Sequence, residues 1–105
     1  MKCNRYTVLN TAESDEWLAE QPEKCKVQIL GRLAHIKEDG HFGDHKDVDG
    51  DVWELKWRSG RRVYYAYIEE SQVLLLLGGN KNGQDKESRQ AKKIFNKHVS
   101  SDEES

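Results

Sequence analysis

The stretch from Val52 to Gln84 constrains the fold more than any other part of the chain, because three strand-like runs follow one another there. In residues 52–57, apolar and charged side chains alternate, which is typical of a strand with one buried face. Arg62 to Ile68 alternates in the same way, and Val73 to Leu77 is apolar at every position. A strand that is apolar throughout is expected to be covered on both faces. The sequence therefore predicts a small, mostly antiparallel sheet.

The turn between the first two strands follows from the parity of their side chains. Pairing must keep the two apolar faces together, because a slip of one residue moves every side chain to the other face. A three-residue loop of residues 58–60 meets this condition and places Gly60 at the left-handed position that such loops favour. It also pairs Lys56 directly with Arg62. Two cations opposite one another repel, which either an anionic ligand or two solvated side chains bending apart would explain. One face of the hairpin is expected to be exposed and to carry Lys56, Arg62 and Tyr64. The other is expected to point into the core and to carry Trp53, Leu55, Val63 and Tyr65.

Helices are predicted on both sides of this stretch. Arg5 to Leu9 reads as a short first strand, followed by a short helix and by a second helix that begins near Pro22 and ends at Gly40. The second helix carries a broad apolar stripe that needs a sheet to cover it, made of Val27, Ile29, Leu30, Leu33, Ala34 and Ile36. After a glycine-rich loop from Gly78 to Gln84, a C-terminal helix from about Asp85 to Lys97 turns Ala91, Ile94 and Phe95 inward.

Length and composition indicate a single α+β domain. The chain has 105 residues, of which 34% are charged and 35% apolar, so one economical core is expected. We assign residues 1–98 to this domain and expect the acidic residues 99–105 to be disordered. The sequence has no signal-like N-terminus and no apolar run long enough for a membrane span, which predicts a cytoplasmic protein without a membrane partner.

The net charge of -2 is unevenly distributed. Acidic residues predominate between Glu38 and Glu54, whereas all charged residues between Lys56 and Arg62 are cations, a local polarity that a phosphate site would need. The loop of residues 40–50 contains several aspartates and two histidines, but it lacks the spacing of a calcium loop or of a helical histidine pair. We expect it to be a solvated linker, and we predict neither a metal site nor a cofactor.

Three segments carry a resemblance to a known family: WELKW, GRRVYYAY and LLLLGGNKNGQ. With the order strand, helical hairpin, three strands and helix, they resemble the RelE/ParE toxin superfamily, and more narrowly the phage-derived, HigB-type addiction-module killer proteins. The resemblance covers roughly residues 6–97. The family usually has arginine where Lys56 stands, and often Asp-Ile where this chain has Glu87-Ser88. The resemblance implies a small sheet backed by the helical hairpin, with an open basic face.

The resemblance also implies a function and partners. Many such toxins cleave mRNA, commonly on the ribosome, and each is normally neutralised by an antitoxin, a helix-turn-helix protein in HigB-type systems. The first expectation is therefore a metal-independent mRNA endoribonuclease of a type II toxin-antitoxin module that inhibits translation. The alternatives are a toxin that binds and poisons DNA gyrase, as ParE-type relatives do, or an inactive relic bound to its antitoxin.

The nuclease hypothesis assigns roles to the cations near the hairpin. Cleavage by the 2′-hydroxyl of RNA develops negative charge on the phosphate oxygens, which fixed cations stabilise. The expected catalytic residues are Arg62, Lys81 and Lys56, and the expected RNA-binding residues are Arg58, Arg61, Tyr64 and Gln84. The general base stays unassigned, since Tyr64 shares the face of Arg62 but an ordinary tyrosine has a pKa of ~10.

Overall fold

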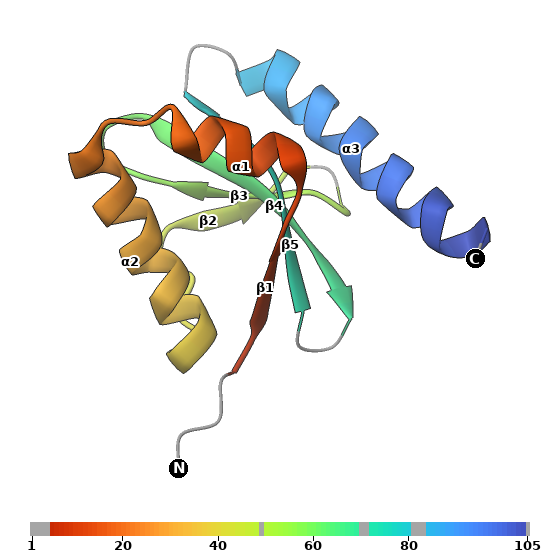
Figure 1. Cartoon of the computed structure of the whole chain (residues 1–105), viewed down its shortest axis with the longest axis horizontal. Coiled ribbons are helices and arrows are strands. Elements are labelled where there is room, and N and C mark those ends of the chain that lie inside the picture. Colours follow the sequence, from red (N-terminus) through yellow and green to blue (C-terminus); the bar gives the residue numbers. More distant parts are fainter. Residues whose placement is uncertain (1–4, 49, 70–71, 81–83, 105) are drawn as a thin grey trace.

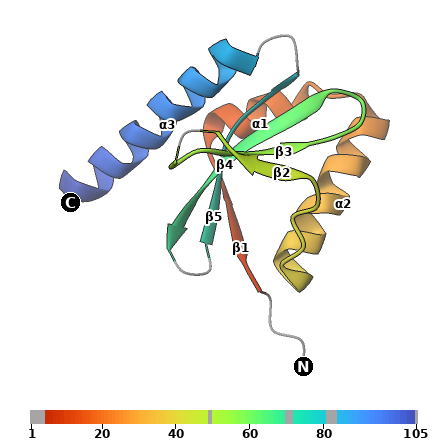
Figure 2. The same cartoon turned by 180° about the vertical axis from the view of Figure 1, so that it is seen from behind.

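The computed structural model describes residues 5–48, 50–69, 72–80 and 84–104, and of residues 69, 80, 84, 85 and 100–104 it describes the backbone. Within these ranges one five-stranded sheet has the order β1-β5-β4-β3-β2, with helices on both faces (Figure 1; Figure 2 shows it from behind). This confirms the predicted α+β architecture. The elements are β1 (Thr7–Asn10), α1 (Ala12–Ala19), α2 (Glu23–Asp39), β2 (His45–Asp47), β3 (Trp53–Lys56), β4 (Arg61–Glu69), β5 (Gln72–Asn80) and α3 (Gln84–Glu104).

The hairpin of β3 and β4 has the register that the alternation predicts. Lys56 lies opposite Arg62, and the loop of residues 58–60 closes with a hydrogen bond from the Gly60 amide to the Trp57 carbonyl oxygen (3.0 Å). Gly60 has φ 97°, a left-handed conformation that glycine adopts with little strain. The predicted three-residue loop is confirmed.

The apolar strand β5 is an inner strand, parallel to β1 and antiparallel to β4. Val73 and Leu75 point into a core shared with α2, whereas Leu74 and Leu76 point into a second core beneath α3. Both faces of β5 are therefore covered, as predicted from its continuous apolar run.

The helical hairpin covers one face of the sheet, but only with part of the predicted stripe. Ile29, Leu33 and Ile36 of α2 are buried in the core. Val27 and Leu30, however, are 64% and 51% exposed. The prediction that a sheet covers the whole stripe is wrong, because these two residues lie on the side of the helix that faces away from the sheet.

The helix α3 packs across the opposite face of the sheet, where the sequence predicted an open basic surface. The predicted inward-facing side chains of α3 (Ala91, Ile94 and Phe95) lie in the second core together with Tyr64. Tyr64 is completely buried there, so the expectation of an exposed face at this position is wrong. The α3 backbone continues to Glu104, and the division of the chain at residue 98 stays a prediction.

The expected linker between Gly40 and Gly50 contains an edge strand. β2 pairs antiparallel with β3 and places Lys46 opposite Glu54. All β2 side chains are exposed, so no alternation of apolar and polar residues marks this strand in the sequence. The prediction of a solvated linker is wrong for residues 45–47.

Two glycines expected in a loop belong to β5, and both are sites of close approach. An ideal Cβ on Gly78 would lie 2.0 Å from the ring of Trp17 in α1, and one on Gly79 would lie 2.0 Å from Oε2 of Glu87 in α3. Neither contact is sterically possible for a larger residue without movement of a helix or a side chain. Gly78 and Gly79 therefore let α1 and α3 approach the two faces of the same strand.

Aromatic rings pack closely between α2 and the sheet. Phe42 stacks on Tyr65 with ring centroids 5.5 Å apart, and Tyr67 meets Tyr65 edge-on at 5.6 Å. Tyr65 is fully buried. Burial raises the pKa of the Tyr65 hydroxyl far above its usual range, and the neighbouring hydroxyl of Tyr67 adds to this effect.

This raised pKa predicts a loss of stability in alkaline solution. Below pH ~10, Tyr65 is protonated in both the folded and the unfolded chain, so its titration does not affect folding. Above that pH the unfolded chain releases the proton and the folded chain keeps it, so the free energy of unfolding falls as pH rises. Urea unfolding between pH 8 and 11 should show a steeper fall for the native chain than for Tyr65→Phe. Equal slopes would contradict this assignment.

Candidate functional site

Arg62, the first choice for binding phosphate, is paired with a buried carboxylate. Its Nη1 donates a hydrogen bond to Oε1 of Glu54 at 2.5 Å. The Arg62 side chain is 13% exposed and the Glu54 side chain 0%. A charge-assisted bond of this kind is stronger than one between neutral groups. Arg62 is therefore a fixed and largely enclosed cation, which corrects the prediction that it lies on an exposed face.

Two lysines on neighbouring strands lie near this pair. Lys46 of β2 places its Nζ 3.6 Å from Oε1 of Glu54. Lys56 of β3 lies opposite Arg62, and its backbone amide donates to the Asp44 carbonyl oxygen (2.9 Å). Of the two cations that pair in this register, Arg62 is neutralised within the protein by Glu54.

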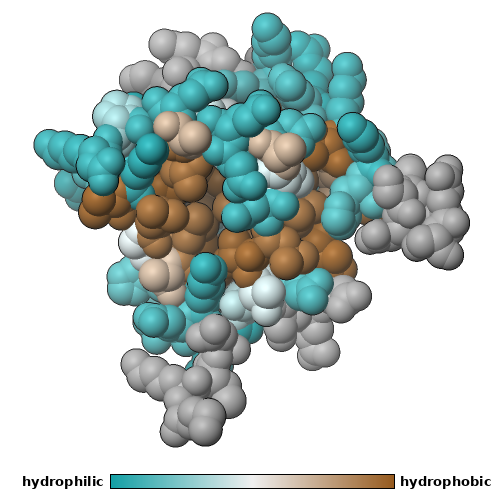
Figure 3. Space-filling view, viewed as in Figure 1, coloured by the Kyte–Doolittle hydropathy of each residue, from teal (hydrophilic) through white to brown (hydrophobic). Residues whose placement is uncertain are grey.

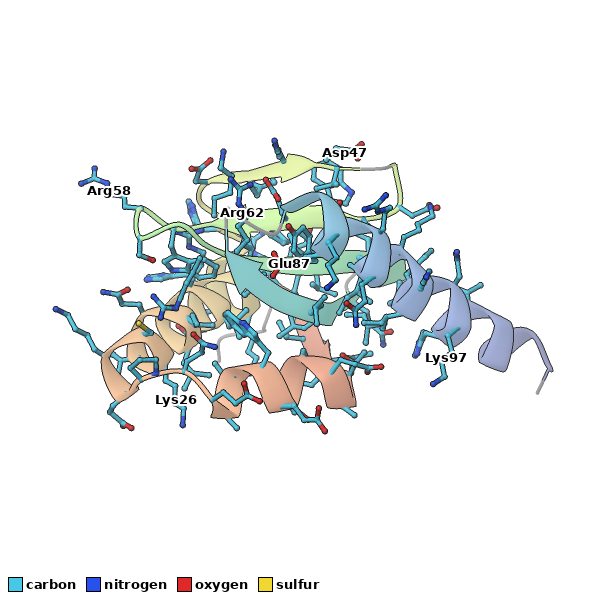
Figure 4. The ribbon with its side chains drawn as sticks, turned by 90° about the horizontal axis from the view of Figure 1, so that it is seen from above. Lys26, Asp47, Arg58, Arg62, Glu87 and Lys97 are labelled. Carbon is cyan, nitrogen blue, oxygen red and sulfur yellow. The ribbon has the colours of Figure 1, made fainter. Side chains whose placement is uncertain are left out.

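A second acid lies beside the pair. Arg62 is opposite Gly79 in the register of β4 and β5, and the carboxylate of Glu87 occupies the space above Gly79. Figure 4 shows Arg62 and Glu87 near the start of α3. The predicted basic site therefore contains cations and carboxylates at close quarters.

The other cations of the hairpin lie apart from this cluster. Arg58 is exposed in the loop between β3 and β4, and in Figure 4 its side chain projects away from Arg62. Arg61 donates from Nε to Oε1 of Gln21 at 2.8 Å, which ties it to the connection between α1 and α2. The structure thus brings Lys56 and Arg62 together and separates them from Arg58.

Three predicted site residues remain: Tyr64, Lys81 and Gln84. Tyr64 lies opposite Glu54 and is completely buried, so its ring presents no open face on which a base could stack. Lys81 lies outside the described residues. Gln84 begins α3, and its backbone alone is described. The roles of Lys81 and Gln84 in RNA binding and catalysis stay predictions.

Neither a metal site nor a membrane-spanning helix is found in the described part of the chain. No group of three or more histidine, cysteine, aspartate or glutamate residues there could hold a metal ion. His45, which suggested a ligand, has its Nδ1 2.8 Å from the Gly43 carbonyl oxygen. Within the same residues, no helix combines the length and the apolar character needed to cross a membrane.

Glu54 is the site residue that the sequence reasoning missed. Alternation placed it on the polar face of β3, where a solvated side chain is the usual expectation. The predicted register nevertheless pairs Glu54 with Tyr64, two residues from Arg62, and such diagonal neighbours on one face are within reach of long side chains. The register alone could therefore have identified this ion pair.

Comparisons with known proteins agree with this fold. The family model of the phage-derived Gp49-like proteins (DUF891) matches residues 16–99. An uncharacterised protein of Haemophilus influenzae is 35% identical in an alignment of 88 positions, which covers 81% of this chain and 88% of that protein.

Two solved structures are similar in fold. A variant of the E. coli toxin RelE in the free state has a TM-score of 0.66 and 20% identity, covering 90% of this chain and 99% of that one. A chain of the intact E. coli RelBE toxin-antitoxin complex has a TM-score of 0.60 and 20% identity, covering 71% and 95%. The resemblance noted in the sequence is confirmed at this level: the chain belongs to the phage-derived Gp49-like family and has the fold of the RelE/ParE-type toxin superfamily.

Proposed function

We propose that this protein is the toxin of a toxin-antitoxin module and acts as an endoribonuclease on mRNA, on the ribosome, without a metal ion. The observation that carries the proposal is the pair of Glu54 and Arg62, joined by a 2.5 Å hydrogen bond. RNA cleavage by its own 2′-hydroxyl needs a proton acceptor and a fixed positive charge next to each other. The pair combines both groups on adjacent strands.

In this mechanism the 2′-oxygen attacks the adjacent phosphorus while Glu54 accepts the hydroxyl proton. Arg62 stabilises the negative charge that develops on the non-bridging oxygens, and Lys56 and Lys81 are proposed to assist it. The bond between phosphorus and the 5′-oxygen then breaks, and the 5′-oxygen takes up a proton from solvent. The products are a 2′,3′-cyclic phosphate and a 5′-hydroxyl end. Arg58, Arg61 and Gln84 are proposed to hold the RNA on either side of the cleaved bond.

This mechanism requires a change around Glu54. The Glu54 side chain is completely buried, so RNA reaches it only after the segment above it moves. The start of α3 lies near Arg62 (Figure 4). We propose that substrate binding displaces this end of α3 and opens the pair to the phosphate.

The partner follows from the same proposal. A chain of the same fold has been seen in a complex described as toxin and antitoxin, which supports an antitoxin partner here. We propose a helix-turn-helix antitoxin encoded beside this chain, which neutralises the toxin by binding to it.

The chemistry of the cleaved ends tests the nuclease proposal. The purified chain is added to ribosomes that carry a defined mRNA, in a buffer containing Mg²⁺. The upstream fragments of the cleaved mRNA should end in a 2′,3′-cyclic phosphate or a 3′-phosphate. Because no metal takes part, replacing Mg²⁺ by a polyamine that preserves ribosomes, together with EDTA, should leave the cuts unchanged. A 3′-hydroxyl end, or a loss of cleavage with intact ribosomes, would exclude this mechanism.

A second function is favoured by one observation. Tyr64 is buried and Arg62 is already paired, which suits a protein that acts through its surface and not through an open catalytic cleft. In that case the chain would bind DNA gyrase. Inhibition of gyrase supercoiling by the purified chain, with no cleavage of ribosome-bound mRNA, would support it.

A further inference from the structure

A row of aromatic side chains reaches the surface on the face of the sheet opposite to Glu54, the face that packs against α2. The rings follow one another from β2 through β3 and β4 to the residue before β1, with neighbouring centroids 5.9, 5.6 and 6.3 Å apart. The first and third rings are exposed and the other two are half-buried. We call these four side chains the aromatic row: His45, Trp53, Tyr67 and Tyr6.

Buried rings hold the aromatic row in place from below. The centroid of the buried Phe42 ring lies 5.2 Å from that of Tyr6 and 5.5 Å from that of His45. The buried Tyr65 ring meets Tyr67 at 5.6 Å. Side chains that packing already fixes lose little freedom when a ligand binds, so they make a favourable contact surface.

The geometry of two of these rings suits a planar ligand. Trp53 and Tyr67 lie at 83° to each other, so a planar group that stacks on one ring meets the other edge-on, and aromatic groups prefer both arrangements. Figure 3 shows hydrophobic side chains at the surface over the strands as well as over α2, so the helical hairpin leaves part of this face uncovered. Aromatic side chains on neighbouring strands commonly stack the unpaired bases of RNA.

Cations lie at both ends of the aromatic row. Arg5 precedes Tyr6, and its backbone amide donates to the Lys37 carbonyl oxygen at 2.6 Å; both side chains are exposed. At the other end, the exposed Lys46 follows His45 on β2. Such cations can meet the phosphates on either side of a stacked base.

Acidic residues near the row differ in where they point. Asp39 lines a groove on the outer side of α2, and Glu38 lies two residues from the buried Ile36, which places it on nearly the opposite side of the helix. Asp47, in contrast, is directly opposite Trp53 in the pairing of β2 and β3, so both side chains are on the same face. A carboxylate there repels phosphate, but it accepts a hydrogen bond from the amino group of a base such as cytosine.

The aromatic row is close to the pair of Glu54 and Arg62 around the edge of the sheet. Trp53 and Glu54 are consecutive residues of β3, so their side chains point to opposite faces. Only β2 separates β3 from this edge, and all of its side chains are exposed. An RNA strand with its cleaved phosphate at Arg62 can therefore pass around β2 and reach the aromatic row.

We propose that the aromatic row stacks bases of single-stranded RNA next to the cleaved bond, and that Asp47 selects bases that carry an amino group. The choice of RNA as the ligand rests on the proposed function. Adenine, guanine and cytosine have an amino group, whereas uracil has none. A protein partner fits less well, because charged residues are depleted at the centre of protein interfaces and Asp47 lies against Trp53 in the middle of the row.

The experiment measures binding of short, fluorescently labelled oligonucleotides to the purified chain by anisotropy. Oligo(C) and oligo(U) with 2′-O-methyl groups are used, because the methyl group blocks the nucleophile of the cleavage reaction. Tyr67→Ala should weaken binding of oligo(C) by about 10-fold or more, the usual effect of removing a stacked ring. Tyr67→Phe keeps the ring and should bind as the native chain does, as should Leu30→Ala, which removes an exposed apolar side chain from α2.

Two further variants complete the test. His45→Ala removes an exposed ring from the edge strand and should weaken binding in the same direction as Tyr67→Ala, with urea unfolding to establish that each variant is folded. The native chain should bind oligo(C) more tightly than oligo(U), and Asp47→Asn should abolish this preference. Equal affinity of the native chain for the two oligonucleotides would contradict the role of Asp47.

The outcomes separate the aromatic row from the nuclease function. If the native chain cleaves ribosome-bound mRNA but binds neither oligonucleotide, or if Tyr67→Ala and His45→Ala bind as tightly as the native chain, the row is not an RNA site and the nuclease proposal stands. If oligo(C) binds with the expected losses in the variants but no mRNA is cleaved, the row stands and the nuclease proposal fails. If Tyr67→Ala weakens binding of the helix-turn-helix antitoxin and not of RNA, the occupant is a protein, which overturns the proposal.

Discussion

Arg62→Ala is expected to lower the free energy of unfolding by about 3–5 kcal/mol, the usual effect of removing one partner from a buried ion pair. The carboxylate of Glu54 would stay buried, and Lys46 at 3.6 Å would be the cation left beside it among the described residues. Denaturant unfolding of the native and variant chains at neutral pH measures this difference. The substitution should also abolish growth arrest.

A double variant separates the two effects of this substitution. Replacing both partners by apolar residues of similar size, as in Glu54→Leu with Arg62→Met, removes the unpaired charge and is often neutral or stabilising. We expect this variant to recover most of the lost stability and to remain non-toxic. If Arg62→Ala unfolds at the same denaturant concentration as the native chain, the pair is not buried in solution as described.

Glu54→Gln should reduce the rate of mRNA cleavage by about 10²–10⁴-fold, the range attributed to a general base. The amide keeps the shape of the side chain and an acceptor oxygen for Arg62, but it takes up no proton. Its cost in unfolding free energy should therefore be smaller than that of Arg62→Ala. Single-turnover cleavage of ribosome-bound mRNA, compared with the unfolding curves, measures both quantities.

A matched control for this variant is Asp51→Asn. Asp51 is an acid just before β3, its carboxylate accepts a hydrogen bond from Lys92 at 2.7 Å, and it is 58% exposed. The substitution removes the same charge outside the pair, and it should leave the cleavage rate nearly unchanged. Cleavage by Glu54→Gln at the native rate would remove Glu54 from the mechanism.

The parts of the fold that could be predicted from sequence are those where one side of an element is apolar and the other polar. Alternation gave the register of Lys56 and Arg62, and the continuous apolar run identified β5 as a strand covered on both faces. The strand β2 could not be predicted, because all of its side chains are exposed and its formation depends on pairing with β3.

The candidate site was harder to predict, because the burial of its residues depends on α3, which is distant in the sequence. Glu54 and Tyr64 lie on a face that reads as polar and exposed, and that face is buried only because α3 packs on it. The apolar pattern of α3, which includes Ala91 and Ile94, predicts that the helix packs on the sheet. The pattern does not indicate which face of the sheet the helix covers. Burial of a charged pair thus follows from tertiary contacts that local patterns do not contain.

The parallel pairing of β1 with β5 has a consequence for how the chain folds during synthesis. Residues 7–10 pair with residues 72–75, so β1 has no partner strand until β5 has been made. Contacts so distant in sequence slow folding, because a long loop must close before they form. A nascent chain therefore cannot complete the sheet until residues 72–75 have left the ribosome. We expect the chain to reach its native state only after β5 has been synthesised, so the pair of Glu54 and Arg62 is enclosed late.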